Sequence, residues 1–573
     1  KDEKMPVNKD NKMTGYASID KPWLKYYSKD AINAEFPKCS IYENIYKANK
    51  EFDNEIALIY YGKKITYKKL FCKVDKVSKS LISYGVRCGD NVGICMPAMP
   101  ETIYLILALN KIGANANMLN LTFAEEELIT LINSTETKLL FIVSEAFNQL
   151  KNVISKSNCT DIIAVSAVNS LNIFTKVIKR VKKIQNTITW DDFIKNGKHN
   201  FFETPVYVPN RPAIMVYSSG TTGASKGIQL TNDSVNATIT EGMYIGFKWN
   251  RQDRCIAVVP IWFSTGICAQ ILMPLHHGIT VILEPLYDFK IFYQHIEAWH
   301  PNFTITAIGL ADYLMNEKEM NDAYKYFKYF VIGGEYITSV MENKLNQWLR
   351  KNGSIEKIHK GYGMCELGGT VTATHYKCNE IGSAGIPTPH VIVAAFDLDT
   401  GKELKYRERG EIRVLSPCKM LGYYKKKEET EKFFHTDLTG RVWCCTGDMG
   451  YVTEDGCLYV DGRIESSYKN EEGDIIYLFD IERAILNIEQ VRQCRVVVSK
   501  VNGVNIHVAH IVLTDAADRI SVLSNIKEYC SNNLQKNHMP TLLKLYNSAL
   551  PVSKAGKVDI IKMQNDVVDL VRL

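Results

Sequence analysis

A loop rich in glycine and hydroxyl residues directly follows an apolar, strand-length run and has the composition of a phosphate-binding loop. The run ends at Val216, and residues 217–227 read YSSGTTGASKG. Glycines let the backbone turn tightly and present N–H groups to an anion, and the hydroxyls and Lys226 add donors. A flexible linker would need neither the lysine nor the strand, and the loop also differs from the G-x-x-x-x-G-K-[ST] pattern. The residues that we expect to bind phosphate are Ser218, Ser219, Gly220, Thr221, Thr222, Gly223 and Lys226.

This loop resembles the phosphate-binding signature of the adenylate-forming superfamily, which includes acyl-CoA synthetases, aryl-CoA ligases, adenylation domains of nonribosomal peptide synthetases and firefly luciferase. The signature usually reads S/T-S-G-T-T-G-x-P-K-G, and Ser225 stands here in place of the proline. Further matching motifs follow in family order from Ile65 to Lys557, so the resemblance covers nearly the whole chain from about residue 40. It implies a mixed α/β fold with a large N-terminal domain of two α/β subdomains and a β-rich subdomain, followed by a small mobile α+β domain.

A second motif, at residues 361–366 (GYGMCE), is similar to the family's Y-G-x-T-E. The resemblance implies that Tyr362 stacks on adenine and that Glu366 holds Mg²⁺, a cation that prefers oxygen ligands. Cys365 replaces the threonine that donates to the α-phosphate, and a thiol is a weaker donor, so neighbouring donors must compensate or the adenylate is held less well. The nucleotide-binding residues assigned in this way are Gly333, Gly334, Glu335, Gly361, Tyr362, Gly363, Cys365 and Glu366.

Three motifs nearer the C-terminus complete the resemblance. Residues 446–448 (TGD) resemble the family motif in which the aspartate, here Asp448, accepts hydrogen bonds from both ribose hydroxyls. Arg463 matches the arginine that reaches toward ribose or phosphate, and Glu465 takes the place of the hinge residue. Lys557, in the segment LPVSKAGK, is expected to bridge the substrate carboxylate and the α-phosphate as charge develops. The residues expected to be catalytic are therefore Lys557, Thr222 and Glu366.

The segment that follows Arg463 departs from the family pattern. Ser466 stands at the position of the usual aspartate, the usual proline is missing, and Gly473 comes one residue late. In the family this loop swings into the active site for the second half-reaction. Thioester formation is therefore the step that these changes affect.

The region after the phosphate loop narrows the choice of acid. Amino-acid-activating relatives carry an aspartate in an F-D-x-S stretch, whereas residues 260–266 read PIWFSTG, which favours an uncharged tail. Nearby aromatic residues suit a fatty, aryl or sterol-like acid, although ordinary core packing explains them equally well. They are Tyr244, Phe247, Trp249, Trp262 and Phe263. The short interval between Glu366 and residues 382–385 leaves no room for the insertion of carrier-protein ligases, which favours CoA as the acceptor.

These features predict an ATP-dependent carboxylic acid:CoA ligase that uses ATP, Mg²⁺ and CoA and forms an acyl-adenylate and then a thioester. A medium- or long-chain fatty acid, or another hydrophobic acid, is the expected substrate. Two alternatives stay open. One is an adenylating enzyme that loads a carrier protein, and the other is an ATP-binding pseudoenzyme, which Cys365 and the irregular hinge suggest.

Predicted strands and helices alternate along the chain, and they must position the site residues. Leu70, Val74, Val77 and Leu81 share one face of a predicted helix. Strands are predicted at residues 92–96, 139–143, 162–165, 213–217, 280–283, 330–332, 411–414 and 457–460. Such alternation favours mostly parallel sheets covered by helices on both faces. The expected division is an N-terminal arm (1–30), an AMP-binding N-terminal domain (31–463) and a small C-terminal domain with the catalytic lysine (464–573).

Composition and charge exclude several other classes of protein. With 573 residues, 46% of them hydrophobic and 23% charged, the chain resembles an ordinary globular protein, and a net charge of +6 is too small for a nucleic-acid partner. Scattered cysteines without a repeated CxxC spacing predict neither a zinc site nor a disulfide framework, and they favour a cytoplasmic location. We expect no membrane span. The basic segment 176–184 predicts at most a peripheral membrane contact, unless it is a solvated helix with its apolar side on the core.

Overall fold

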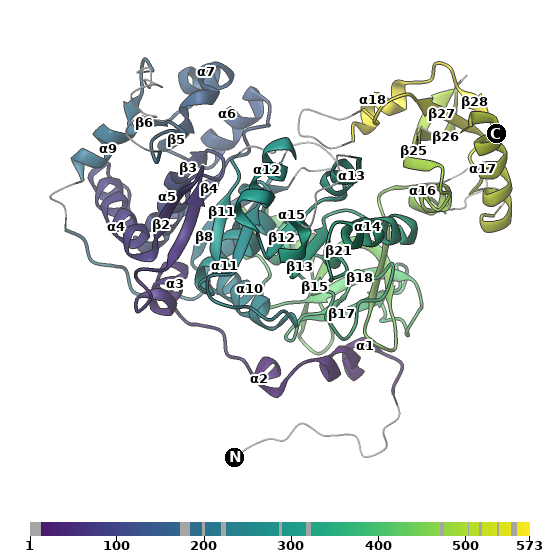
Figure 1. The fold of residues 1–573 in the computed structure, drawn as a ribbon, viewed down its shortest axis with the longest axis horizontal. Coiled ribbons are helices and arrows are strands. Elements are labelled where there is room, and N and C mark those ends of the chain that lie inside the picture. Colours follow the sequence, from purple (N-terminus) through teal and green to yellow (C-terminus); the bar gives the residue numbers. More distant parts are fainter. Residues whose placement is uncertain are drawn as a thin grey trace.

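The computed structural model describes residues 13–171, 184–197, 201–218, 225–285, 289–316, 323–469, 475–501, 503–514, 518–535, 538–551 and 558–573. Within these ranges the chain has two large sheets with flanking helices, a β-rich unit and a smaller C-terminal domain (Figure 1). The mixed α/β fold that the sequence predicts is therefore confirmed.

The first α/β subdomain is built on a sheet in which eight strands of the described chain pair. In spatial order they are β19 (Gly422–Tyr423), β9 (Lys226–Thr231), β8 (Pro212–Ser218), β4 (Asn115–Met118), β3 (Asn91–Cys95), β5 (Leu139–Val143), β6 (Asp161–Val165) and β7 (Ile188–Thr189). The strands from β8 to β7 run parallel, and β9 and β19 extend one edge antiparallel. The helices around this sheet are α4 (Tyr67–Ser83), α5 (Pro100–Lys111), α6 (Glu125–Ser134), α7 (Phe147–Lys156) and α9 (Trp190–Asn196).

Helix α4 confirms the helix predicted around residues 70–81. Its N-terminus is capped by the Thr66 hydroxyl, which accepts a hydrogen bond from the backbone N–H of Lys69. Leu70, Val74 and Leu81 are fully buried, as their helical spacing requires. The sequence pattern thus sets both the start of this helix and the face that it buries.

The second α/β subdomain is built on a sheet of nine strands from the described ranges. In spatial order they are β16 (Ile386–Pro387), β15 (Thr372–Ala373), β14 (His359–Tyr362), β13 (Tyr329–Gly333), β12 (Phe303–Thr306), β10 (Arg254–Ala257), β11 (Thr280–Leu283), β1 (Ile56–Tyr60) and β2 (Lys63–Thr66). The strands from β14 to β1 are parallel. Helices α12 (Phe289–Trp299), α13 (Ile308–Asn316) and α14 (Ser339–Lys351) share one hydrophobic cluster with this sheet.

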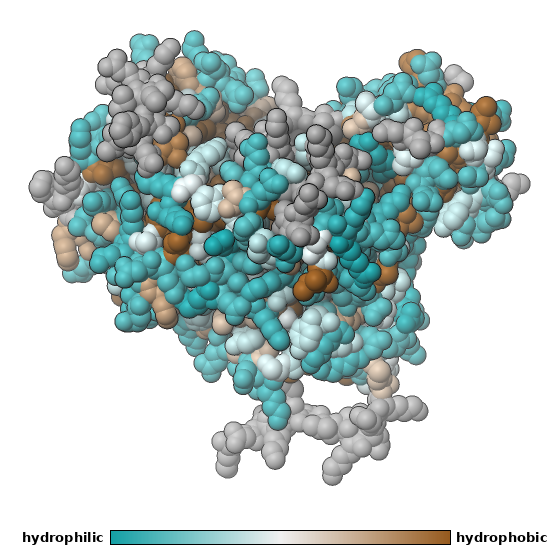
Figure 2. Space-filling view, viewed as in Figure 1, coloured by the Kyte–Doolittle hydropathy of each residue, from teal (hydrophilic) through white to brown (hydrophobic). Residues whose placement is uncertain are grey.

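The remaining strands form the β-rich unit and the C-terminal domain. The β-rich unit is antiparallel and contains β17 (Ile392–Phe396), β18 (Gly410–Leu415), β20 (Phe434–Thr436), β21 (Val442–Val452) and β22 (Leu458–Arg463), with α15 (Lys427–Phe433) beside it. The C-terminal domain contains β23 (Ser467–Lys469), β24 (Ile475–Tyr477), α16 (Leu478–Leu486), β25 (Val491–Val501), β26 (Val504–Leu513), α17 (Arg519–Asn533), β27 (Leu542–Tyr546), α18 (Ile560–Asn565) and β28 (Val571–Arg572). This domain has its own hydrophobic cluster, and a notch at the top of the space-filling view separates it from the larger body (Figure 2).

The described part of the N-terminal segment packs along the β-rich unit. It contains α1 (Ala17–Asp20), η1 (Pro22–Tyr26) and α2 (Lys29–Ile32). Trp23 is fully buried beside Gly456, where an added Cβ would lie 2.8 Å from the Trp23 backbone nitrogen. The domain boundaries at residues 30 and 463 stay predictions.

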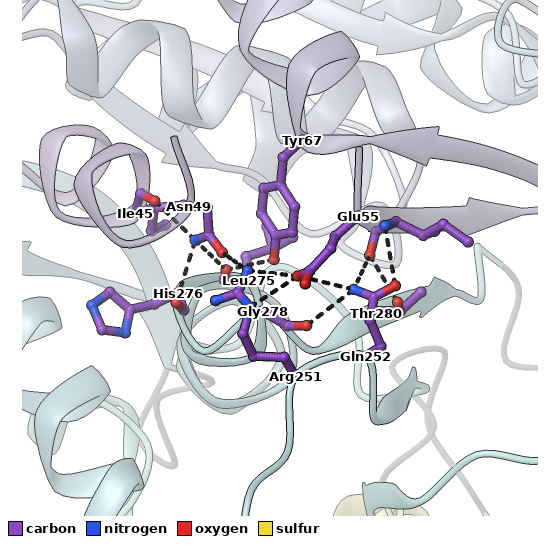
Figure 3. A network of polar contacts seen from close by, with 11 residues as sticks. Ile45, Asn49, Glu55, Tyr67, Arg251, Gln252, Leu275, His276, Gly278 and Thr280 are labelled. Atoms are coloured by element: carbon purple, nitrogen blue, oxygen red, sulfur yellow. Dashed lines mark hydrogen bonds and ion pairs between the residues drawn. The ribbon is translucent and has the colours of Figure 1, made fainter. Parts of the chain in front are cut away.

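Three helices join the two large subdomains: α3 (Ile41–Asn49), α10 (Asn232–Tyr244) and α11 (Met273–His276). Figure 3 shows the polar network at this junction. Arg251 donates to Glu55 Oε2 at 2.7 and 2.9 Å and to Asn49 Oδ1 at 2.9 Å, and the Tyr67 hydroxyl donates to the Leu275 carbonyl at 2.7 Å. These bonds satisfy Asn49 of α3 against Arg251 and Tyr67 of α4 against α11, and residues of both subdomains share one hydrophobic cluster.

Helices long and apolar enough to cross a bilayer do not occur in the part of the chain that the structure describes. The cytoplasmic location stays a prediction.

Candidate active site

A cavity of ≈ 1790 Å³ lies where the two α/β subdomains and the β-rich unit meet. It brings together most of the predicted site residues that the structure describes. Those that line it are Ser218, Lys226, Gly333, Gly334, Glu335, Gly361, Tyr362, Gly363, Cys365, Glu366, Arg463 and Glu465. Asp448 is joined to them through the Tyr362 hydroxyl, which donates to its Oδ2 at 2.6 Å. Residues scattered over about 250 positions of sequence therefore converge on one cavity.

Some predicted residues lie outside the described residues. They are Ser219, Gly220, Thr221, Thr222, Gly223, Gly473, Lys557 and the basic segment up to residue 183. Their roles stay predictions.

Strand ends explain why the nucleotide motifs meet. β13 and β14 are parallel neighbours, so residues 333–335 and 361–366, which end them, reach the same edge of the sheet. Ligands of open α/β sheets bind at the carboxyl ends of such strands. Ser218 and Lys226 are a register pair of β8 and β9, so the two ends of the predicted phosphate loop lie side by side. Gly363 lies directly against the backbone at Gly369. An added Cβ would be 2.3 Å from the Gly369 carbonyl oxygen, so this position requires glycine.

Asp448 is a buried carboxylate with two partners, the half-buried Tyr362 and the exposed Arg463. Its Oδ2 accepts from the Tyr362 hydroxyl, and its Oδ1 lies 3.0 Å from Nε of Arg463. Burial raises the pKa of Asp448, and the Arg463 charge and the Tyr362 hydrogen bond act against this rise. Both carboxylate oxygens are engaged but keep lone pairs for further donors, so a vicinal diol can share the site with these partners.

Glu366 is a second buried carboxylate, and it lines the cavity directly. Its side chain is buried, and its Oε1 accepts from the Tyr423 hydroxyl at 2.9 Å. Burial raises the pKa of Glu366, whereas Tyr423, Arg463 and Lys226 lower it. The Lys226 ammonium lies 5.2 Å from the centre of the Tyr423 ring, which places a cation near this carboxylate. A buried carboxylate beside the lysine of the predicted phosphate loop fits Mg²⁺, which takes its other ligands from phosphates and water.

The rest of the cavity is mainly apolar. Phe247, Trp262 and Phe263 line it, followed by residues of the π-helix η3 (Thr265–Leu272). Tyr244 and Trp249, which the sequence also suggested, are not among the lining residues, and the Trp249 indole donates to the Gly242 carbonyl at 2.9 Å. The aromatic residues therefore divide between the two roles considered from the sequence. Phe247, Trp262 and Phe263 line the cavity, where they can contact a substrate, and Trp249 packs in the core behind the cavity wall.

Glu241 is a lining residue that the sequence did not suggest. It lies on α10 with its side chain 3% exposed, and its Oε1 pairs with Nδ1 of His390 at 2.6 Å. The Glu241 hydrogen bond raises the pKa of His390 above its ordinary value. Because the two residues are 149 positions apart, no local pattern signals the pair.

Comparisons with known proteins show which family of enzymes the chain is similar to. A family model described as "AMP-binding enzyme" matches residues 45–424, more than half of the chain. The chain is 25% identical to a long-chain-fatty-acid–CoA ligase of Bacillus subtilis (strain 168), over 82% of this chain and 85% of the relative.

Solved structures share the fold over nearly the whole chain. The anthranilate CoA ligase AuaEII in complex with anthranoyl-AMP has a TM-score of 0.78 at 19% identity, covering 92% of this chain and 97% of that one. ATP-bound MatB from Rhodopseudomonas palustris has a TM-score of 0.77 at 20% identity, covering 91% and 99%. The chain therefore belongs to the AMP-binding enzyme family, in the acyl-CoA synthetase branch of the adenylate-forming superfamily.

Proposed function

We propose that this enzyme is an ATP-dependent carboxylic acid:CoA ligase for a hydrophobic acid, of which a medium- or long-chain fatty acid is the first candidate. The observation that carries the proposal is the continuity of one cavity from the polar corner at Lys226, Glu366 and Arg463 to the apolar arm at Phe247 and Trp262. Such a cavity accepts a charged nucleotide at one end and an apolar tail at the other.

In the first half-reaction the substrate carboxylate attacks the α-phosphorus of ATP, and pyrophosphate leaves. Ser218 and Lys226 stand at the two ends of the loop that binds the phosphates, and Tyr362 and Asp448 bind adenine and ribose. Glu366 would hold Mg²⁺, which when bound offsets the negative charge of the phosphates. Lys557, assigned by resemblance, steadies the charge that develops between carboxylate and phosphate.

In the second half-reaction the CoA thiol attacks the acyl carbon, and AMP leaves. Glu465 lines the cavity at the predicted hinge between the large domain and the C-terminal domain. A rotation about this residue withdraws Lys557 and admits the thiol.

The pair of Glu241 and His390 affects which substrate tails the apolar arm of the cavity accepts. The two charges compensate each other inside the wall of the apolar arm, so the arm favours a neutral tail over one that carries an ammonium group.

The test is incubation with ATP, Mg²⁺, CoA and a panel of fatty, aryl, bile and amino acids, with the products identified by mass spectrometry. An acyl-CoA and an equal amount of AMP support the proposal and identify the acid. An acyl-adenylate without thioester favours the carrier-protein alternative. Absence of acid-dependent AMP, combined with retained nucleotide binding, contradicts the proposal in favour of a pseudoenzyme. Lys557→Ala is the matched control, because it should lose most adenylation and keep nucleotide binding.

A further inference from the structure

Two cysteines outside the active site approach each other in the interior. Cys378 lies in the loop between β15 and β16, and Cys457 lies in the turn that leads into β22. Their Sγ atoms are 3.1 Å apart, and the residues are 3% and 2% exposed. The structure records both as free thiols. A disulfide has an S–S length of about 2.05 Å, so a movement of about 1 Å joins them.

Backbone contacts hold both cysteines in place. Cys378 and His375 exchange backbone hydrogen bonds of 2.8 and 3.0 Å. The Thr453 N–H donates to the Cys457 carbonyl at 3.0 Å, and the Cys457 N–H donates to the Thr453 hydroxyl at 3.2 Å. The backbone N–H of Ala384 donates to the carbonyl of Leu458 at 2.8 Å, which pins the two segments together beside the sulfurs. The sulfur contact therefore rests on two ordered turns and not on one free side chain.

The surroundings activate one of the two thiols. The hydrogen bonds with Cys457 and with the Tyr26 hydroxyl together lower the pKa of Cys378 to about 7, although burial acts against them. The contact between the two thiols raises the pKa of Cys457. Other titratable groups near the two thiols are Tyr27, Lys360, His375, Glu380, Asp455 and Tyr459. Because the Tyr26 hydroxyl also hydrogen-bonds Cys378, we assign Cys378 as the nucleophile and Cys457 as its partner thiol.

We propose that Cys378 and Cys457 are a redox-sensitive dithiol that hydrogen peroxide converts into a disulfide. The Cys378 thiolate attacks one peroxide oxygen, which gives a sulfenic acid and releases hydroxide. Cys457 then attacks that sulfur, the S–S bond forms, and water leaves. Two thiols are oxidised by two electrons, and one peroxide is reduced to two waters. This inference does not depend on the proposed function.

The bond would join two segments that support the nucleotide site. The carbonyl of Glu380, in the Cys378 loop, accepts from Lys360 Nζ at 2.7 Å, and Lys360 lies next to Gly361 on β14. β22, which follows Cys457, ends at Arg463. Oxidation therefore fastens the strand that carries Arg463 to the loop that supports β14.

The experiment treats the full-length protein with hydrogen peroxide and follows it by intact mass and by peptide mapping without reduction. We expect a loss of about 2 Da, a cross-linked peptide that contains Cys378 and Cys457, recovery of both thiols with dithiothreitol, and a higher melting temperature for the oxidised form. Cys457→Ser should leave a Cys378 sulfenic acid that a dimedone probe labels. Tyr26→Phe should slow the reaction, because it removes a donor to the thiolate.

Cys72 and Cys88 are internal controls, since both are exposed and neither lies in this pair. Oxidation of these residues while the Cys378–Cys457 peptide stays reduced would overturn the proposal. The same holds if Cys378→Ser loses 2 Da as readily as the unmodified protein. Circular dichroism of each variant separates a loss of folding from a loss of the reaction.

Discussion

At the scale of single residues, the proposed nucleotide site is organised by two buried carboxylates, Asp448 and Glu366, each with hydrogen-bond or ion-pair partners. Asp448 has Tyr362 on one oxygen and Arg463 on the other, and Glu366 has Tyr423. Burial raises the pKa of both carboxyl groups, so each depends on its cationic and hydroxyl neighbours to stay ionised. Substitutions that keep shape and remove charge are therefore informative.

Asp448→Asn should weaken ATP binding and leave the affinity for the acid unchanged. The amide is a poorer acceptor for the ribose hydroxyls, and a hydrogen bond to a charged group is worth about 1.5–3 kcal/mol, or roughly 10- to 100-fold in KM for ATP. Steady-state kinetics with ATP as the varied substrate measure the KM for ATP, and kinetics with the acid as the varied substrate measure the KM for the acid. Tyr362→Phe, which keeps the carboxylate, is the matched variant. An increase confined to the KM of the acid would remove Asp448 from the ribose site.

Glu366→Gln should reduce adenylation by on the order of 100-fold and weaken its dependence on Mg²⁺, because the amide has lost the charge that holds the cation. The pyrophosphate release rate over a Mg²⁺ titration measures this. Because protonation of this buried carboxyl competes with the cation, the unmodified enzyme should need more Mg²⁺ as pH falls. Tyr423→Phe leaves the carboxylate in place and should have a smaller effect. An unchanged Mg²⁺ requirement in Glu366→Gln would contradict the assignment.

At the scale of elements, an ion network joins the C-terminal domain to the β-rich unit. Arg409, next to β18, binds Asp480 on α16 through two bonds of 2.6 and 3.0 Å, and it pairs with Asp461 on β22 at 2.6 Å. Arg483 on α16 also pairs with Asp461 at 2.6 Å. Because Asp461 is buried between two arginines, the network stabilises the present orientation of the C-terminal domain more than an exposed pair would.

Arg409→Gln should loosen this orientation. We expect hydrogen exchange of α16 to rise severalfold while β3 to β6 exchange as before, because the contact of Arg409 with Asp480 on α16 is lost and β3 to β6 lie outside the network. Arg407→Gln is the control, since Arg407 pairs with Glu454 at 2.9 Å on the surface with 63% and 48% of the side chains exposed. Equal exchange in both variants would show that the network does not hold the domain.

At the scale of the whole molecule, buried histidines set the response to acid. Burial lowers the pKa of His276 to about 4, of His277 to about 3 and of His359 to about 4. Unfolded histidine takes up a proton near pH 6.5, so the unfolded chain binds more protons than the folded one between pH 6.5 and these values. Stability should therefore fall as pH falls through this window.

Urea unfolding at pH 7, 6, 5 and 4.5 measures that dependence. We expect the free energy of unfolding to decrease at each step below pH 6.5, and His276→Gln should reduce the slope by about one proton. The comparison with His276→Gln separates this effect from the titration of carboxyl groups. Identical slopes in the two proteins would mean that His276 is protonated in the folded state.

Patterns between neighbouring positions allowed the sequence to predict the repeating elements and the chemistry of the motifs. Helical spacing predicted α4, an apolar run predicted β8, and glycines with hydroxyls predicted a phosphate loop after it. These features depend on local backbone preferences and on residue types within a few positions. The alternation of strands and helices predicted the fold class, and the resemblance of the motifs to known signatures indicated the family.

The tertiary structure alone decided which distant residues touch. Tyr362 meets Asp448 across 86 positions, Glu241 meets His390 across 149, and Cys378 meets Cys457 across 79. It also decided that Phe247 lines the cavity while Trp249 packs behind it. Such contacts depend on the order and register of strands within whole sheets, which no single stretch of sequence encodes.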